Sequence, residues 1–401
     1  MGTSFFRWHC TFLVAALLLG SAFAAEPLIT WERSALETAR ERIRSGDEVL
    51  LPAFEALVRT ADRALEEGPW TVTEKPFTPP SGDKRDYMSV GPYWWPNPDT
   101  EDGLPYIRRD GETNPERHEY DNNTMGQMRN AVRPLILAWY FTGEERYAER
   151  AAKVLRVWFL DEDTRMNPHL EYGQAIPGRT EGRDIGIIDT VMLCNLMNEL
   201  VLLRGADSWS AEDDAALREW FSDYLRWLLE SGHGKSEGSR VNNHGTWYDA
   251  QVVAYALFTG EEATARSVLE KVGERRVAVQ IAPDGRQPHE LGRTRAYSYT
   301  VYNLMAFTDL AMMGRHVGVD VWNYESEDGR SIRRALEWFA PYAANPDDMP
   351  YEQIVSPNLS GAWWLYRVAA EPLGVPEWRE LAMEIGPPGP DHYHHLILLP
   401  E

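Results

Sequence analysis

The chain of 401 residues carries 62 acidic and 40 basic side chains, which gives a formal net charge of −22 at pH 7. This acidic excess argues against nucleic-acid binding, because nucleic acids are bound by basic surfaces. It permits a polyanionic partner only where basic side chains line a cleft, since the local charge decides what binds there.

The first 25 residues have the pattern of a secretory signal peptide. Arg7 precedes an apolar run over residues 11–20, and Ala22-Phe23-Ala24 forms a small-residue cleavage site. The run is short for a membrane span, although an uncleaved anchor is the alternative. We therefore predict export to the periplasm or the medium, with a mature protein that begins near Ala25 or Glu26 and does not contact a membrane.

The mature chain, residues 26–401, is expected to form a single domain, because no linker rich in Pro, Gly or Ser divides it. Of the two cysteines, Cys10 leaves with the signal, so Cys194 has no disulfide partner. Cys194 lies in the apolar run VMLCNLMNELVLL, which favours a small buried hydrophobic residue. The sequence does not indicate an oligomeric state.

Apolar residues recur at three- and four-residue spacing along most of the mature chain, as expected for amphipathic helices. The pattern predicts helices over residues 38–44, 51–66, 130–141, 146–159, 185–204, 211–229, 248–258, 263–272, 298–313 and 332–342. The helix at 211–229 is expected to bury one face made of Leu217, Trp220, Phe221, Tyr224, Leu225 and Leu228.

A five-residue repeat, FTGEE, occurs at residues 141–145 and 258–262. In each copy Gly permits a turn after a helix, and Thr with the Glu three residues later predicts a capping box for the next helix. Ser210 and Asp213 predict a similar helix start. Antiparallel helix pairs with short turns predict an all-α fold, an (α/α) toroid that is an incomplete barrel of helix hairpins around a cleft. A helical solenoid is the alternative.

A long irregular segment, residues 71–123, separates the early helices from the rest. Segments of this length are usually functional or disordered. Its aromatic cluster, Tyr93-Trp94-Trp95, argues against disorder, because disordered segments are poor in aromatic residues. We predict an ordered aromatic loop over one side of the cleft, in which these three rings stack on sugars. Packing within the loop is the alternative.

Two segments carry the groups needed for chemistry at a sugar carboxylate. Residues 242–249 read NNHGTWYD, and residues 289–304 read HELGRTRAYSYTVYNL. β-Elimination at a uronate requires a neutralised carboxylate, a base for the C5 proton and an acid for the glycosidic oxygen O4. Asn243 can donate its amide N–H to the carboxylate, and His244 can donate beside it or act as the base. No metal or cofactor is required for this reaction, and none is expected.

The Arg/Tyr cluster of the second segment fits two registers. Tyr299 can take the C5 proton and deliver one to O4 if Arg293 or Arg295 lowers its pKa from about 10. Arg295, Tyr299 and Tyr302 share one face if the helix has begun by Arg295, and Arg293 precedes it in the loop. The structural alternative is that Asn-Asn-His only caps a helix and that the tyrosines are core residues.

The chain resembles the alginate lyase superfamily of polysaccharide lyases, which are (α/α) toroids. The likeness runs from DYMSVGPYWWPNPDTEDGLPYIRRDGETNPE at residues 86–116, through NPHLEYGQAIPGRTEGRDIGIIDT at 167–190 and NNHGTWYD, to YNL at 302–304. The resemblance implies that Asn243 and His244 are catalytic, and that the family's Arg and Tyr lie within residues 293–302. We favour Tyr299 with Arg293, and Tyr302 with Arg295 is the second choice.

Three residues of a glycine-broken loop, Gln174, Arg179 and Arg183, are further candidates for substrate binding. Arginine binds carboxylates through two parallel hydrogen bonds, whereas internal ion pairs with Glu171, Glu181 or Asp184 are the alternative. The segment 391–395, DHYHH, has the composition of a metal site, but we expect a surface tail.

These observations predict an exported polysaccharide lyase that cleaves an acidic polysaccharide, alginate (polymannuronate) or glucuronan, by β-elimination. A glycoside hydrolase is one alternative, for which Asp189, Asp249 and Glu290 would have to supply two carboxyl groups across the bond. A non-catalytic glycan-binding protein is the other.

Overall fold

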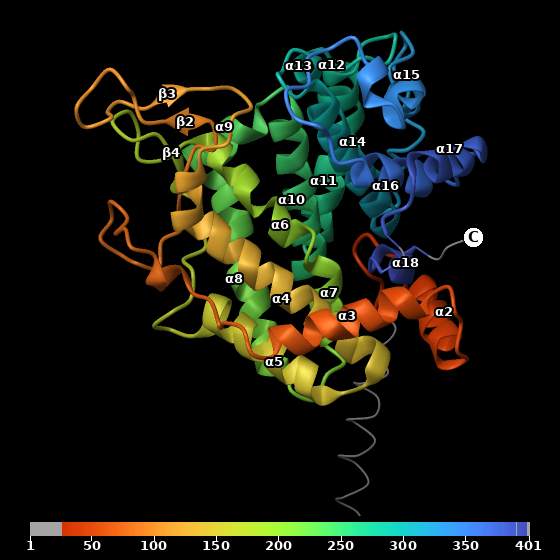
Figure 1. Cartoon of the computed structure of the whole chain (residues 1–401), viewed down its shortest axis with the longest axis horizontal. Helices are drawn as coiled ribbons and strands as arrows, with labels where there is room; N and C mark the ends of the chain where they lie inside the picture. Colours follow the sequence, from red (N-terminus) through yellow and green to blue (C-terminus); the bar gives the residue numbers. More distant parts are fainter. Residues whose placement is uncertain (1–25, 390, 399–401) are drawn as a thin grey trace, which may run out of the picture.

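The computed structural model describes residues 26–389 and 391–398, and within these ranges the chain is mainly helical (Figure 1). The longer helices are α2 (Arg33–Arg44), α3 (Leu51–Ala64), α4 (Asp121–Thr142), α5 (Glu145–Leu155), α8 (Ala211–Glu230), α10 (Asn243–Thr259), α11 (Glu262–Val272), α14 (Ala296–Met313), α15 (Ile332–Ala343), α16 (Ser360–Ala369) and α17 (Glu377–Ile385). The shorter ones are α6 (Val191–Cys194), α7 (Met197–Leu203), α9 (Gly232–Gly238), α12 (Ala278–Gln280), α13 (Pro288–Leu291) and α18 (His394–Ile397). The strands are β1 (Met88–Val90), β2 (Trp94–Trp95), β3 (Ile107–Arg108) and β4 (Tyr172–Ala175).

Helix hairpins build the core, and α10 lies at its centre. Of the 17 residues of α10, 14 are buried, because this helix packs between α8, α11 and α14. The pairs α4–α5, α10–α11 and α16–α17 pack as hairpins, and α14 joins α10 to α16. Helix α18 packs against α2 and α3, so the two ends of the helical arc meet (Figure 1). The predicted all-α architecture of helix hairpins is confirmed.

The turn predictions are confirmed in part. The capping box of Ser210 and Asp213 is present at the start of α8, and α8 buries the six predicted residues. Gly143 and Gly260, the glycines of the repeat, end α4 and α10 at φ of 76° and 86°, which L side chains rarely adopt. The capping boxes predicted within the repeat are wrong. The hydroxyls of Thr142 and Thr259 donate instead to carbonyls one turn back in their own helices.

The helix predicted over residues 185–204 is wrong, because the segment is broken into a 3₁₀ turn (Asp184–Thr190), α6 and α7. Thr190 ends the 3₁₀ turn, where its hydroxyl donates to the carbonyl of Ile187 at 2.8 Å. The carbonyl of Asn195 accepts from the Arg133 guanidinium, which removes it from the helical hydrogen-bond pattern. The break turns polar groups of this segment toward the cleft described below.

The aromatic loop, residues 71–123, is ordered as predicted. Strands β2 and β3 form an antiparallel hairpin within it, and β1 pairs in parallel with β4. A buried ion pair holds the base of the loop, since the Lys75 Nζ lies 2.8 Å from Asp121 Oδ2 and both side chains are at most 1% exposed. Asp121 also accepts the N–H of Met88 at 2.8 Å. These contacts fix the loop against the start of α4.

The tail at residues 391–395 is docked, so the predicted surface tail is wrong. The ring of His394 stacks on Trp363 with centroids 5.8 Å apart, and the Tyr393 hydroxyl accepts from Arg133 at 2.9 Å. Burial lowers the pKa of His394 to about 3, so its ring is neutral at physiological pH. Cys194 is buried, as predicted, and is a free thiol within the described residues. The predicted signal peptide lies outside the described residues.

Across the described ranges, no single helix has the length and apolar composition needed to cross a membrane. The bent pair formed by Asp184–Cys194 and Met197–Leu203 passes this test only when the two parts are joined.

One buried carboxyl in α14 gives a testable pH dependence. Burial raises the pKa of Asp309 to about 7, well above its value in the unfolded chain. A raised folded-state pKa stabilises the fold at low pH, and this contribution is lost as the pH rises through the folded value. We expect Asp309→Asn to raise the free energy of unfolding by roughly 1–3 kcal/mol at about pH 8, with a gain that shrinks toward pH 4. Urea unfolding at both pH values checks this, and an equal difference at both would contradict it.

Candidate active site

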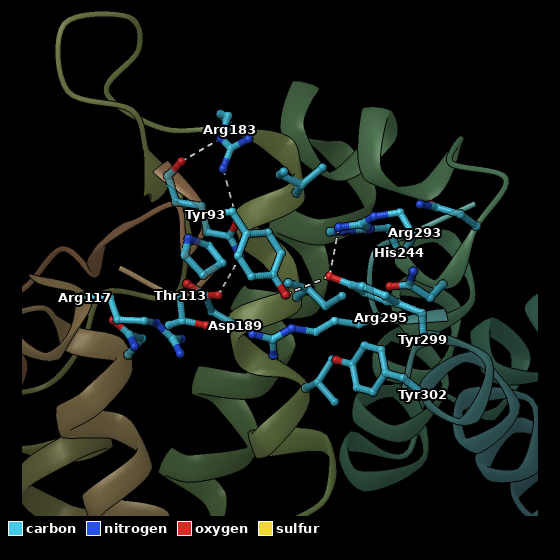
Figure 2. Close-up of a pocket in the computed structure, with 18 of the residues that line it drawn as sticks. Tyr93, Thr113, Arg117, Arg183, Asp189, His244, Arg293, Arg295, Tyr299 and Tyr302 are labelled. Atoms are coloured by element: carbon cyan, nitrogen blue, oxygen red, sulfur yellow. Dashed lines mark hydrogen bonds between the residues drawn. The ribbon is translucent and has the colours of Figure 1, made fainter. Parts of the chain in front are cut away.

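A cleft of about 780 Å³ opens between the aromatic loop, the broken segment after β4 and the N-terminal ends of α10 and α14 (Figure 2). Most of the residues predicted from the sequence line it together, namely Tyr93, Trp94, Gln174, Arg183, Asn243, His244, Arg293, Arg295, Tyr299 and Tyr302. Trp95 and Arg179 do not line it. The Trp95 indole donates to the carbonyl of Glu112, and Arg179 lies over the Trp94 ring while it donates to the carbonyl of Tyr106.

The lining of the cleft is strongly basic, although the protein as a whole is acidic. Seven arginines line it: Arg108, Arg117, Arg129, Arg183, Arg240, Arg293 and Arg295. Asp189 is the one carboxylate among the lining residues, and it already accepts hydrogen bonds from Tyr87, Ser89 and Gln174. Because field lines concentrate in such clefts, the site attracts a polyanion despite the net charge of −22. This basic lining could not be recognised from the overall composition.

Tyr299, on the first turn of α14, lies between Arg293 and Tyr93 (Figure 2). Arg293 Nη2 donates to the Tyr299 hydroxyl at 3.0 Å, and its guanidinium carbon lies 4.1 Å from the centre of the Tyr299 ring. The Tyr93 hydroxyl lies 2.9 Å from that of Tyr299. Burial raises the pKa of Tyr299, Tyr93 raises it further, and Arg293 opposes both. The expected net lowering of this pKa is therefore wrong for the ligand-free protein, in which Tyr299 is a neutral phenol.

The second register has a different geometry. The Arg295 guanidinium donates to the carbonyl of Gly111 and lies over the Tyr93 ring rather than beside Tyr302. The Tyr302 ring packs on Trp247 with centroids 5.0 Å apart, and its hydroxyl has no hydrogen-bond partner among the described residues. Tyr299 is thus the tyrosine that a cation contacts directly.

Arg293 is itself held by a residue that the sequence did not point to. Asp110, just after β3, accepts from Arg293 Nη2 at 2.8 Å and from Nε at 3.2 Å. Burial opposes ionisation of Asp110, but the hydrogen bonds and charges of Arg293 and Arg108 outweigh it and lower its pKa to about 2. Asp110 is therefore an anion at neutral pH.

Asn243 is the first residue of α10, and Glu290 fixes its side chain. The Glu290 carboxylate accepts the backbone N–H of Asn243 and its side-chain N–H, both at 2.7 Å. Asn242 has the N-cap position but makes no capping hydrogen bond through its side chain, so Glu290 satisfies this helix start. The Oδ1 of Asn243 is buried without a hydrogen-bond partner among the described residues. The second amide hydrogen of Asn243 is left for a ligand.

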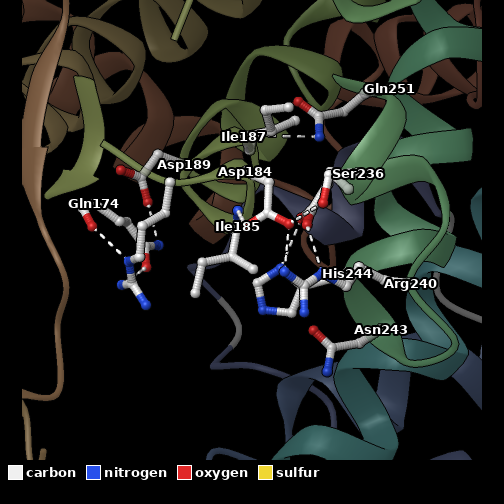
Figure 3. Close-up of polar contacts among 12 residues, drawn as sticks. Gln174, Asp184, Ile185, Ile187, Asp189, Ser236, Arg240, Asn243, His244 and Gln251 are labelled. Carbon is white, nitrogen blue, oxygen red and sulfur yellow. Dashed lines mark hydrogen bonds and ion pairs between the residues drawn. The ribbon is translucent and has the colours of Figure 1, made fainter. Parts of the chain in front are cut away.

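His244 is oriented in the same way by a buried carboxylate. Its Nδ1 lies 2.7 Å from Oε1 of Glu237 in α9, whose side chain is 1% exposed. An ionised Glu237 places the imidazole proton on Nδ1, which leaves the lone pair on Nε2 for the cleft. Arg240, in the turn between α9 and α10, pairs with Asp184, and Asp184 also accepts the Ser236 hydroxyl at 2.6 Å (Figure 3).

A fully buried arginine supports the turn that leads to Asn243 and His244. Arg276, 1% exposed, donates to the carbonyls of Gly238 at 2.8 Å and Arg240 at 2.6 Å, and pairs with Asp249 at 2.6 and 2.9 Å. Gly245 is required beside it, because a Cβ there would lie 2.1 Å from the carbonyl oxygen of Arg240.

Gln174 and Arg183 form a fixed unit at the opposite wall. Gln174 adopts a φ of 48°, donates its side-chain N–H to Asp189 at 2.9 Å and accepts from Arg183 through both its backbone and side-chain oxygens. Burial lowers the pKa of Arg183 to about 10, so it stays charged at neutral pH. A guanidinium that is held by neutral oxygens keeps its charge for a ligand.

The three carboxyl groups from which the hydrolase alternative would draw its pair do not face one another across the cleft. Asp249 is bound to Arg276 at 2% exposure, Glu290 holds Asn243, and Asp189 lies at the far wall with its own three donors. Among the described residues, no group of three or more His, Cys, Asp and Glu side chains is placed to hold a metal ion.

Comparisons with known proteins identify the family of the chain. The family model for alginate lyase matches residues 71–349. The structure is similar to that of an alginate lyase from Bacteroides ovatus, with a TM-score of 0.90 and 38% identity over 93% of this chain and 99% of that one.

More distant structures share the fold alone. Two variants of alginate lyase A1-III, a histidine-to-alanine and a tyrosine-to-phenylalanine variant, each complexed with a tetrasaccharide, have TM-scores of 0.54 at 15% identity over 91% of this chain and 94% of theirs. No curated protein sequence matches the chain significantly. The family match, the toroid of helix hairpins and the basic cleft lead to one conclusion: the chain belongs to the alginate lyase family and is a polysaccharide lyase.

Proposed function

We propose that this lyase cleaves a polyuronate, either alginate (polymannuronate) or glucuronan. The reaction is a β-elimination that leaves unsaturated uronate ends. The observation that carries the proposal is the 3.0 Å hydrogen bond from Arg293 to the Tyr299 hydroxyl, in a cleft lined by seven arginines. The name of the similar structure from Bacteroides ovatus supports alginate as the polymer.

The first step is neutralisation of the uronate carboxylate, because the C5 proton becomes acidic only when charge can move onto that group. Asn243 donates its free amide hydrogen to the carboxylate, and Glu290 keeps the amide in this orientation. Arg293 adds positive charge beside the reacting carbon. These donors are fixed before the substrate arrives, so little reorganisation is needed in the transition state.

Both proton transfers are then carried out by one side chain, Tyr299. In the substrate complex Tyr299 acts as the phenolate, after its hydroxyl proton has passed to solvent. It takes the C5 proton, and the electron pair of the C5–H bond forms the C4–C5 double bond. The C4–O4 bond breaks, and the phenol of Tyr299 gives the proton to O4. One residue serves as base and acid when the C5 hydrogen and O4 lie on the same side of the ring, as in mannuronate and glucuronate.

Guluronate presents its C5 hydrogen on the opposite face, so a second base is required. His244 suits this task, since Glu237 holds the proton on Nδ1 and leaves Nε2 as the acceptor. Tyr299 then acts as the acid only.

This division of roles predicts a substrate-dependent effect of His244→Gln. We expect the rate on polyguluronate to fall about 100-fold or more, the usual contribution of a general base, and the rate on polymannuronate to fall less than about tenfold. Initial rates of unsaturated product on the two purified polymers measure this. His289→Gln, an exposed histidine outside the cleft lining, is the matched control and should change neither rate. Equal fractional losses on both polymers would show that His244 only binds the carboxylate.

We also propose that the protein is exported to the periplasm or the medium. The support is the basic residue, short apolar run and Ala-Phe-Ala site within residues 1–25. Mass spectrometry of the mature N-terminus from cells tests cleavage near Ala25, and an intact N-terminus would contradict it.

A further inference from the structure

Asp110 joins the aromatic loop to the base of the active site. It follows strand β3 in the loop, and its carboxylate accepts hydrogen bonds from Arg108 at 2.6 Å, from the Thr294 hydroxyl at 3.1 Å and from two nitrogens of Arg293. Asp110 does not line the cleft, so it reaches the reaction only through these neighbours.

The contacts of Arg293 make this link specific. Its Nη2 atom donates both to Asp110 at 2.8 Å and to the Tyr299 hydroxyl at 3.0 Å, and the guanidinium plane lies against the Tyr299 ring. Among the described residues Asp110 is the only carboxylate paired with Arg293. A long side chain with one ionic anchor takes its position from that anchor.

We propose that Asp110 is a positioning residue for the lyase reaction. It holds Arg293 against Tyr299, so that the cation can stabilise the phenolate of Tyr299 only while the aromatic loop is packed against the start of α14. This inference rests on the proposed role of Tyr299. It gives the loop a function beyond covering the cleft, because the same loop supplies Tyr93, whose hydroxyl contacts that of Tyr299 at 2.9 Å.

Asp110 has two opposite electrostatic effects on the pKa of Tyr299, one direct and one through Arg293. The carboxylate itself raises the pKa of Tyr299 by direct repulsion of the phenolate, whereas the Arg293 that it holds lowers it. If Asp110 acts only through its charge, its removal lowers this pKa. If Asp110 positions Arg293, its removal releases the cation and raises this pKa. The other polar groups near the phenol, which stay constant in the comparison, are Tyr93, Arg295 and His244.

The experiment is the pH dependence of turnover in Asp110→Asn. The value of kcat should rise with pH as Tyr299 ionises in the substrate complex, and in the variant this rise should move to higher pH. We expect kcat to fall about 10- to 100-fold at neutral pH, the loss typical of a misplaced supporting group, with KM changed less than about threefold. Asp99→Asn, an exposed carboxylate at the tip of the same loop, is the control and should behave as wild type. Asp110→Glu restores the charge and should recover part of kcat.

The combination with Arg293→Gln completes the test. In that background Asp110→Asn should have little further effect, because the residue it positions is absent. A shift of the pH profile to lower pH, an unchanged kcat, or an equal loss in the Arg293→Gln background would each overturn the proposal. Tyr299→Phe distinguishes failure of the proposed function from failure of the proposed role of Asp110. If that variant keeps turnover, the proposed function itself fails, whatever the result for Asp110→Asn.

Discussion

Tyr299→Phe is expected to lower turnover on polymannuronate about 10³-fold or more while oligosaccharide binding is retained, because one hydroxyl performs both proton transfers. The ring that packs under Arg293 is preserved in the variant, so the shape of the cleft should not change. Initial rates of unsaturated product, together with the dissociation constant of a uronate tetramer by calorimetry, measure the two parts of this prediction.

Tyr302→Phe is the matched comparison, since Tyr302 lies one turn further along α14 and lines the same cleft. Its hydroxyl has no contact with a cation, so we expect a rate within about threefold of wild type, as for removal of a group without a partner. The reverse pattern, with Tyr302→Phe inactive and Tyr299→Phe active, would move the reaction to the Arg295 register.

Arg276→Met is expected to lower the free energy of unfolding by about 3–5 kcal/mol, which is the cost of leaving one partner of a buried ion pair uncompensated. Asp249 would stay buried at 2% exposure without its bidentate partner, and the carbonyl of Arg240 would lose its donor. Arg275, which also donates to the carbonyl of Gly238, would remain as a weaker partner of Asp249 at 3.8 Å. Urea unfolding measures the change. The turn before Asn243 and His244 should also loosen, so activity should fall at temperatures where the variant is still folded.

Arg286→Met provides the control, because Arg286 pairs with Asp284 at about half exposure and such surface pairs contribute at most about 1 kcal/mol. The double variant Asp249→Leu/Arg276→Met should recover much of the lost stability, since no buried charge remains. A loss below about 1 kcal/mol for Arg276→Met alone would contradict the role given to this pair.

The sequence predicted those parts of the fold in which local pattern and packing agree. Helix α8 is amphipathic and begins with a capping box, so both its bounds and its buried face were predictable. The segment after Asp184 was predicted as one helix because its apolar residues are continuous. The break depends on Thr190 and on Arg133, which contacts Asn195 from another helix, and sequence spacing does not reveal such a contact.

The same limit applies to the site. Asn243, His244, Arg293 and Tyr299 were found because the reaction demands those groups and two short motifs contain them. Their supports, Glu290, Glu237 and Asp110, are ordinary acidic residues in sequence, and only the fold brings each of them to within hydrogen-bond distance. Trp95 and Arg179 share the composition of the site residues, but the hairpin of β2 and β3 turns Trp95 away from the cleft.

The central claim, elimination rather than hydrolysis of a polyuronate, is tested most directly by following ultraviolet absorbance of unsaturated uronate and new reducing ends in the same reaction on purified polymannuronate. We predict that the two rise together, one double bond for each new end, and that both are lost in Tyr299→Phe. Reducing ends that appear without any gain in ultraviolet absorbance would contradict it.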